Sequence, residues 1–166
     1  MTLDQVPAGA QVFVDSNIFV YHFQPHPVFG PTCHRLLERV ERQDIEGFTS
    51  ATPLSEVAHR LMVVEAGTLP GWGSGKVLNR LKKQPAVVQQ LTLFQTAVTA
   101  VIQSNIRVLA VSGTLVPAAA VLSRQQGLLT NDALILALMR QHGFTYLASH
   151  DSDFDVVAGL TRYWPA

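Results

Sequence analysis

Short apolar runs alternate with amphipathic stretches along this chain of 166 residues. The apolar runs predict strands at 11–14, 47–50, 107–111 and 146–149, with an edge strand at 160–164. Helical spacing predicts a helical region at 76–104, divided in two by Pro85, and helices at 18–23, 33–42, 52–66, 115–126 and 131–142, the last two closed by Gly127 and Gly143. Because strands alternate with helices, we expect an α/β fold with a central parallel sheet covered on both faces.

Residues in the middle of the chain predict a helix cap and a loop. Thr52 is expected to cap the helix at 52–66, with Pro53 at the first helical position and Glu56 near the third. Glycines crowd around Trp72 and predict a loop at 67–75.

The composition is apolar for a single domain of this length. Hydrophobic residues make up 48% and charged residues 14%, where about a quarter is usual for charged residues. The surplus of hydrophobic residues fits either an interface with a partner or the ordinary core of the protein. It is concentrated in one stretch: Val87, Val88, Leu91, Leu93, Phe94, Val98, Val101 and Ile102.

Charge and cysteine content set further bounds. The net charge is +0, so binding to nucleic acid would need a local basic surface or a second subunit. The single cysteine, Cys33, forms no disulfide within the chain and is expected to be buried. The N-terminus has no basic region followed by an apolar core, and no apolar run approaches the roughly 20 residues of a membrane span. We therefore expect a soluble protein of the cytoplasm with no membrane contact.

Acidic residues lie at predicted strand ends and helix starts, where proteins with a parallel sheet carry their functional sites. Asp15 follows the first strand, Asp151 follows the strand at 146–149, and Glu56 and Asp132 lie in the first turns of two helices. All four are expected to converge beyond the carboxyl ends of the strands. Carboxylates this close repel one another unless a cation neutralises them, and Mg²⁺ and Mn²⁺ prefer such oxygen ligands. The sequence has no His/Cys spacing typical of zinc ligands, which argues against a zinc site.

Each acid also has a simpler explanation when it is taken alone. Asp15 and Asp132 suit helix caps, and Glu56 can pair with Arg60 four residues later. Asp151, like the nearby Asp153, suits a turn. The combination is more specific than any one of its members.

Together these motifs resemble the PIN-domain proteins, in particular the VapC-type toxin ribonucleases. The resemblance spans essentially the whole chain, and it rests on Val14-Asp15-Ser16-Asn17-Ile18, Ser55-Glu56, Leu129-Thr130-Asn131-Asp132-Ala133-Leu134-Ile135-Leu136-Ala137 and Ser149-His150-Asp151-Ser152-Asp153-Phe154. It implies a single three-layer α/β/α PIN domain over 1–166, Rossmann-like, with 67–104 forming a loop plus helical segment beside the active site.

The resemblance also implies roles for individual residues. The catalytic acids would be Asp15, Glu56, Asp132 and Asp151, with Asp15, Asp132, Asp151 and Asp153 as metal ligands. Asn17 would orient the first aspartate, and Ser149 stands where the family usually carries threonine. The implied activity is a Mg²⁺- or Mn²⁺-dependent endoribonuclease that hydrolyses RNA phosphodiesters with a metal-activated water. The implied partners are an RNA substrate, a small antitoxin protein and a second copy in a homodimer.

Contacts to RNA phosphates require basic side chains near the acidic rim. Arg60, Lys82 and Lys83 are the first candidates, since they lie between Glu56 and Asp132 in the chain. One competing reading is a PIN-fold module that binds RNA or protein with weak or no catalysis. Another is an aspartyl-nucleophile phosphatase, which needs a second aspartate where this chain has Asn17.

Overall fold

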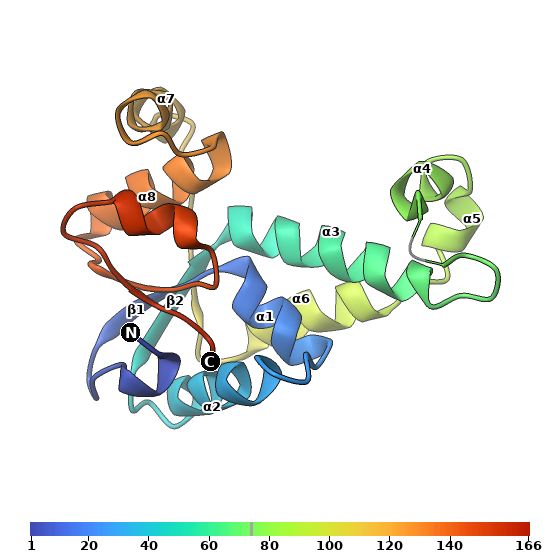
Figure 1. Cartoon of the computed structure of the whole chain (residues 1–166), viewed down its shortest axis with the longest axis horizontal. Helices are drawn as coiled ribbons and strands as arrows, with labels where there is room; N and C mark the ends of the chain where they lie inside the picture. The colour runs from blue at the N-terminus through green and yellow to red at the C-terminus, as the bar shows by residue number, and fades with distance from the viewer. Residues whose placement is uncertain (74) are drawn as a thin grey trace.

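Five parallel strands form one central sheet in the computed structural model, which describes residues 1–73 and 75–166 (Figure 1). The strands are β1 (Gln11–Val14), β2 (Glu46–Ser50), β3 (Arg107–Leu109), β4 (Tyr146–Ala148) and β5 (Thr161–Tyr163). Their order is β3-β2-β1-β4-β5, and every neighbouring pair is parallel. The predicted α/β class, parallel sheet and edge strand are confirmed.

One face of the sheet is covered by α1 (Ser16–Phe23), α2 (Gly30–Glu41), α3 (Ala51–Gly67) and α6 (Leu93–Gln103). Val12 and Val14 of β1 point into this layer, because alternate side chains of a strand face opposite sides. Cys33 packs there with an exposed fraction of 0%, as expected.

The other face is covered by α7 (Leu115–Gln126), α8 (Thr130–His142) and the short 3₁₀ helix η2 (Ser152–Val156). Phe13, Phe48 and Leu147 supply the sheet's contribution to this second core. The two cores make three layers, α/β/α. No helix in the described part of the chain is long and apolar enough to cross a membrane.

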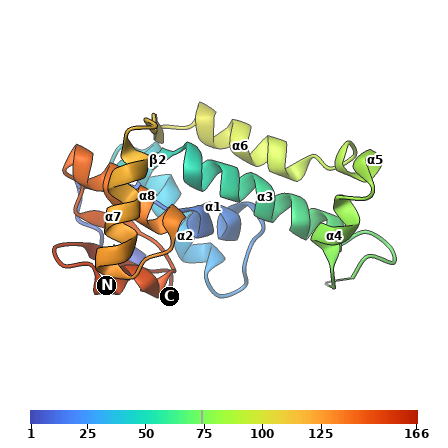
Figure 2. The same ribbon diagram turned by 90° about the horizontal axis from the view of Figure 1, so that it is seen from above.

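Helix α3 extends well beyond the sheet and forms an arm (Figures 1 and 2). At its far end lie α4 (Val77–Leu81) and α5 (Pro85–Val88), which pack on a small separate core of Ala66, Val77, Leu81 and Leu91. Helix α6 then returns beside α3 toward the sheet (Figure 2). The loop predicted around Trp72 precedes α4, and its residue Ser74 lies outside the described residues.

Two local predictions were wrong, and the first concerns the start of α3. Helix α3 begins at Ala51 with Ser50 at its cap position, so Thr52 is not the cap and Pro53 stands in the third position. Proline is tolerated there because the first four N–H groups of a helix have no partner within the helix.

The region at 76–104 forms three helices rather than two. Its second break precedes α6, where the Glu65 carboxylate of α3 accepts hydrogen bonds from the backbone N–H groups of Thr92 and Leu93, 2.9–3.1 Å long. This cap comes from a distant segment of the chain and has no local sequence signal.

Candidate active site

The acidic residues gather beyond the carboxyl ends of the central strands. Asp15 directly follows β1, and Ser149 to Asp153 follow β4, which is paired with β1 in the register Val14↔Ala148. Helix α3 begins directly after β2, on the other side of β1. Because it begins at Ala51, earlier than predicted, Glu56 lies in its second turn and not in its first. Asp132 lies in the first turn of α8. The predicted convergence therefore follows from the parallel register.

Asp15 is held by a buried hydrogen-bond network. Its exposed fraction is 5%, and its Oδ1 accepts from the Ser16 backbone N–H at 2.7 Å. Its Oδ2 accepts from the Asn17 side-chain amide at 2.7 Å and from the Ser149 hydroxyl at 2.6 Å. Burial raises the pKa of Asp15 above its usual value, while the hydrogen bond from Ser149 opposes that rise.

The two supporting side chains have defined orientations. Ser149 Oγ donates its proton to Asp15 and accepts from the Asp151 backbone N–H at 3.0 Å. The Asn17 side-chain oxygen accepts from the His150 backbone N–H at 2.9 Å, which fixes its amide toward Asp15. The hydroxyl and the amide thus lock the first aspartate to the loop that follows β4.

Three carboxylates form the tightest acidic group that the described residues contain. Asp132, Asp151 and Asp153 each offer an oxygen within 4.8 Å of the other two. A Mg²⁺ ion holds its oxygen ligands at about 2.0–2.1 Å and so spans oxygens up to about 4 Å apart. Small side-chain rotations would therefore bring this trio onto one ion, and an all-oxygen donor set suits Mg²⁺ or Mn²⁺.

The electrostatics of Asp132 identify the other members of the site. Its pKa is raised to about 6, first by burial and then by the charges of Asp151, Asp15, Asp153 and Glu56. Asp15 and Glu56 stand outside the tight trio but close enough to repel Asp132. The five carboxylates therefore lie close enough to repel one another, and a bound cation would reduce that repulsion.

Glu56 also pairs with Arg60 one turn later, with Nη1 and Oε1 3.5 Å apart. Both side chains are 40% exposed, so this pair contributes little to stability. The pair places one cation at the edge of the acidic group.

The predicted RNA-contacting lysines lie elsewhere. Lys82 follows α4, which packs near Ala66 at the far end of α3, and Lys83 is next in the chain. Ten helical residues separate Glu56 from Ala66, about 15 Å along the axis. Most of the segment at 67–104 therefore lies on the arm. Its last helix, α6, runs back toward the sheet.

The sequence did not reveal an aromatic group beside the acids. Tyr21 Oη lies 3.0 Å from His150 Nδ1, and the Phe29 and His150 rings are 4.4 Å apart. Residues 21, 29 and 150 come from three separate segments, so no local motif could join them. Ser50, next to α3, has a buried hydroxyl without a hydrogen-bond partner among the described residues.

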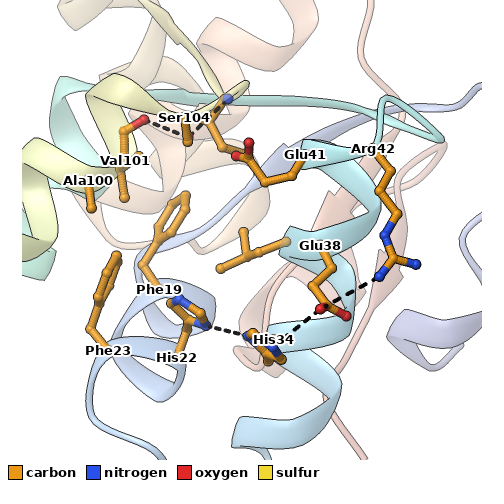
Figure 3. Close-up of a pocket in the computed structure, with 12 residues that line it drawn as sticks. Phe19, His22, Phe23, His34, Glu38, Glu41, Arg42, Ala100, Val101 and Ser104 are labelled. Carbon is orange, nitrogen blue, oxygen red and sulfur yellow. Dashed lines mark hydrogen bonds and ion pairs between the residues drawn. The ribbon is translucent and has the colours of Figure 1, made fainter.

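A separate cavity of about 320 Å³ lies between α1, α2 and α6 (Figure 3). Phe19, Phe23 and Val101 give it an apolar lining, while Glu38 and Glu41 are acidic members of its wall. His22 and His34 meet at this cavity with their Nδ1 atoms 3.3 Å apart, and His34 Nε2 lies 3.5 Å from Glu38.

Fold and site together define a parallel α/β protein with a carboxylate centre suited to a hard divalent cation. The family model of the PIN domain matches residues 12–160. The chain belongs to the PIN domain family.

Known proteins of similar sequence and structure agree with this assignment. Ribonuclease VapC2 of Methanocaldococcus jannaschii is 28% identical over 145 residues, which cover 87% of each chain. The structure of Mycobacterium tuberculosis VapC20, described as a sarcin-ricin loop cleaving toxin, has a TM-score of 0.61 at 20% identity and covers 90% of this chain and 96% of that one. VapBC2 from Rickettsia felis, solved with a promoter DNA fragment, gives 0.58 at 17% identity, with 94% and 99% covered. The structural likenesses show the fold.

Proposed function

We propose that this protein is the toxin of a toxin–antitoxin module and acts as a divalent-metal-dependent endoribonuclease. The observation that carries the proposal is the acidic trio of Asp132, Asp151 and Asp153 beside Asp15 and Glu56, in a chain of the PIN family. The similarity to a protein named as a ribonuclease supports RNA as the substrate.

Each residue has a defined part in this proposal. Asp15, Asp132, Asp151 and Asp153 would hold the ion, with Glu56 completing the acidic rim. A bound Mg²⁺ or Mn²⁺ would supply a water of lowered pKa and offset the charge of the phosphate. Asn17 and Ser149 orient Asp15 through their hydrogen bonds, and the hydrogen bond from Ser149 favours its ionised form. Arg60 stands beside Glu56, where it can reach a phosphate.

The test is cleavage of structured cellular RNA by protein free of antitoxin. Reactions with Mg²⁺, with Mn²⁺ and with chelator run beside the Asp15→Asn and Asp132→Asn variants. We expect discrete cuts that require metal and are abolished in both variants, whose folds circular dichroism should show to be intact. Undiminished cutting by either folded variant would refute the site. Metal binding without cleavage of any RNA would favour the non-catalytic binding module instead.

The apolar cavity at α1, α2 and α6 supports the antitoxin part of the proposal (Figure 3). Its apolar lining suits an antitoxin segment with apolar side chains, while Glu38 and Glu41 of its wall already contact Arg42 and Asn105. Ala100 lines the cavity and is exposed, so Ala100→Trp should fill it without disturbing the core. We expect this variant to lose affinity for the antitoxin and to keep its metal-dependent RNA cleavage. Unchanged antitoxin affinity would remove the cavity from the proposal.

We also propose a homodimer. Of the apolar residues concentrated at 87–102, Leu91 and Val101 are buried in the protein's own core, whereas Ile102 is 59% exposed. Other large apolar side chains lie exposed on α7 and just before α8: Val116, Val121 and Leu129. Light scattering at micromolar concentration should give twice the chain mass, and a monomer would contradict the dimer.

A further inference from the structure

An open polar cleft lies beside the acidic group. It has a volume of about 540 Å³, and it is lined by Ala51, Thr52, Ser55, Glu56, His59 and Asn131. Its walls are the first turns of α3 and the start of α8. Glu56 belongs to the cleft and to the acidic rim alike, and Asn131 directly precedes Asp132. Whatever is bound at the acids therefore has this cleft as its immediate neighbour.

Besides Ala51 and the Glu56 carboxylate, the lining consists of side chains able to form hydrogen bonds. The side chains of Thr52, Ser55, His59 and Asn131 form no hydrogen bond with any other described residue. Asn17 and Ser149, on the other side of Asp15, use their polar groups within the protein. The donors and acceptors of the cleft are free for a ligand.

We propose that this cleft binds the base of the nucleotide next to the scissile phosphate, with His59 as its main contact. The inference rests on the proposed ribonuclease function and adds a specificity subsite to it. Single-stranded RNA is recognised by stacking on aromatic or histidine rings and by hydrogen bonds to base edges. The lining offers one ring and three small polar groups. Its volume falls within the range of about 300–1,000 Å³ that is usual for ligand sites.

The charges favour a base over a phosphate. No Lys or Arg is among the described residues that line the cleft. Arg60, which follows Glu56 by one helical turn, forms an ion pair with it at 3.5 Å. A phosphate placed in the cleft would be repelled by the Glu56 carboxylate, whereas a base carries no negative charge to repel.

His59 is well placed for such a contact. It follows Glu56 by three residues on α3, so the imidazole and the carboxylate lie on one face of the helix. The side chain is exposed, and its replacement should leave the core intact. A base that stacks on this ring would set the register of the strand relative to the acids.

The first experiment compares cleavage of short RNAs that differ only in the bases flanking the cut. We expect His59→Ala to raise KM about 5- to 150-fold, the range for losing one stacked base. Its kcat should stay within threefold of the wild-type value, and the preference for the base beside the cut should be lost. His34→Ala is the matched control, because that histidine is also exposed but lies on α2. Wild-type KM and base preference in His59→Ala would overturn the subsite.

A second variant tests the cleft by filling it. Ser55 is exposed, so Ser55→Phe should occupy the cleft without unfolding α3. We expect RNA affinity in Ca²⁺, measured by fluorescence anisotropy, to fall at least tenfold while Mn²⁺ affinity stays unchanged. Unchanged RNA affinity would contradict the proposal.

Failure of the subsite and failure of the nuclease can be distinguished. If the wild type cleaves RNA and both variants behave like it, only the subsite falls. If the wild type binds RNA without cleaving it, the nuclease proposal falls, and the affinities of the two variants still decide the subsite. If the wild type neither binds nor cleaves RNA, both proposals are overturned.

Discussion

Replacement of Asp132 by asparagine should stabilise the metal-free protein while it destroys metal binding. The carboxylate of Asp132 is half-buried, and four other acids repel it. Its pKa is about 6 in the folded protein, whereas an aspartate free in water has a pKa of 3.8. Folding at neutral pH therefore forces an unfavourable charge into the site, and a neutral amide of similar shape removes that cost.

The size of the effect follows from the pKa difference. A rise from 3.8 to about 6 corresponds to about 3 kcal/mol. Because the side chain is only half-buried, solvent screening reduces this to about 1–2 kcal/mol. For a chain of this length, the midpoint of thermal unfolding should rise by roughly 2–8 °C.

The sign depends on pH in a defined window. Below about pH 4 the Asp132 carboxyl is protonated in the folded and the unfolded state, so the variant should have no advantage. Between about pH 4 and 6 the folded wild type still holds the proton, and its stability relative to the variant declines as pH rises. Above about pH 7 the full difference should be present.

The assay is urea unfolding of both proteins in chelator at pH 4.5 and pH 7.5, repeated in Mn²⁺ at pH 7.5. Mn²⁺ at 100 times its Kd should stabilise the wild type by about 2.7 kcal/mol and the variant by much less, which reverses their order. Asp155→Asn is the control with the opposite sign, because Arg162 at 2.6 Å lowers the pKa of Asp155. A variant of Asp132 that is no more stable than the wild type at pH 7.5 in chelator would refute the reasoning.

Three further predictions concern single buried positions. Ser149→Ala removes the hydrogen bond to Asp15 and should weaken Mn²⁺ binding about 10- to 100-fold by calorimetry, whereas Ser149→Thr should keep most of the affinity; equal losses would contradict this role. Cys33 is buried and has a pKa of about 12, so alkylating reagents should modify it only after unfolding, and rapid labelling of native protein would contradict its burial. Gly47→Ala would place a Cβ 2.5 Å from Ile106 Cδ1 and should cost about 1–3 kcal/mol in urea unfolding, while no loss would show that the neighbouring side chain yields freely.

Local signals in the sequence predicted most of the elements correctly. Gly127 and Gly143 end α7 and α8 in the left-handed conformation, with φ of +76° and +73°. Apolar runs located all five strands, and strands that alternate with helices pair in parallel. The gathering of the acids at one edge of the sheet follows from that pairing, since Asp15 and Ser149 each follow neighbouring parallel strands directly.

Features that depend on contacts between distant segments were not predictable. The break before α6 depends on Glu65, 27 residues away from Thr92. Lys82 is far from the acids because α3 extends well beyond the sheet. The hydrophobic periodicity of the sequence does not show how far a helix extends past a sheet. His150 acquires its partners Tyr21 and Phe29 only through the packing of α1 and the loop before α2 against the end of β4.

The distribution of charge leads to a last prediction about RNA binding. The acids at the site repel phosphate until a cation is bound, and Arg60 is the arginine placed at their edge. Lys82 lies on the arm, about 15 Å or more from Glu56 along α3. A short RNA of about five nucleotides at the acids should therefore form few ionic contacts with the protein.

The dependence of affinity on salt measures those contacts. For single-stranded nucleic acid, each contact contributes about 0.7 to the slope of log affinity against log salt concentration. In saturating Ca²⁺, Arg60→Ala should reduce the slope for a five-nucleotide RNA by about 0.7, while Lys82→Ala combined with Lys83→Ala should leave it unchanged. A longer RNA that reaches the arm should respond to the lysines as well. If the lysine variant lowered the slope for the short RNA, the substrate would have to run along α3 toward the arm, and the cleft at His59 would not be its path.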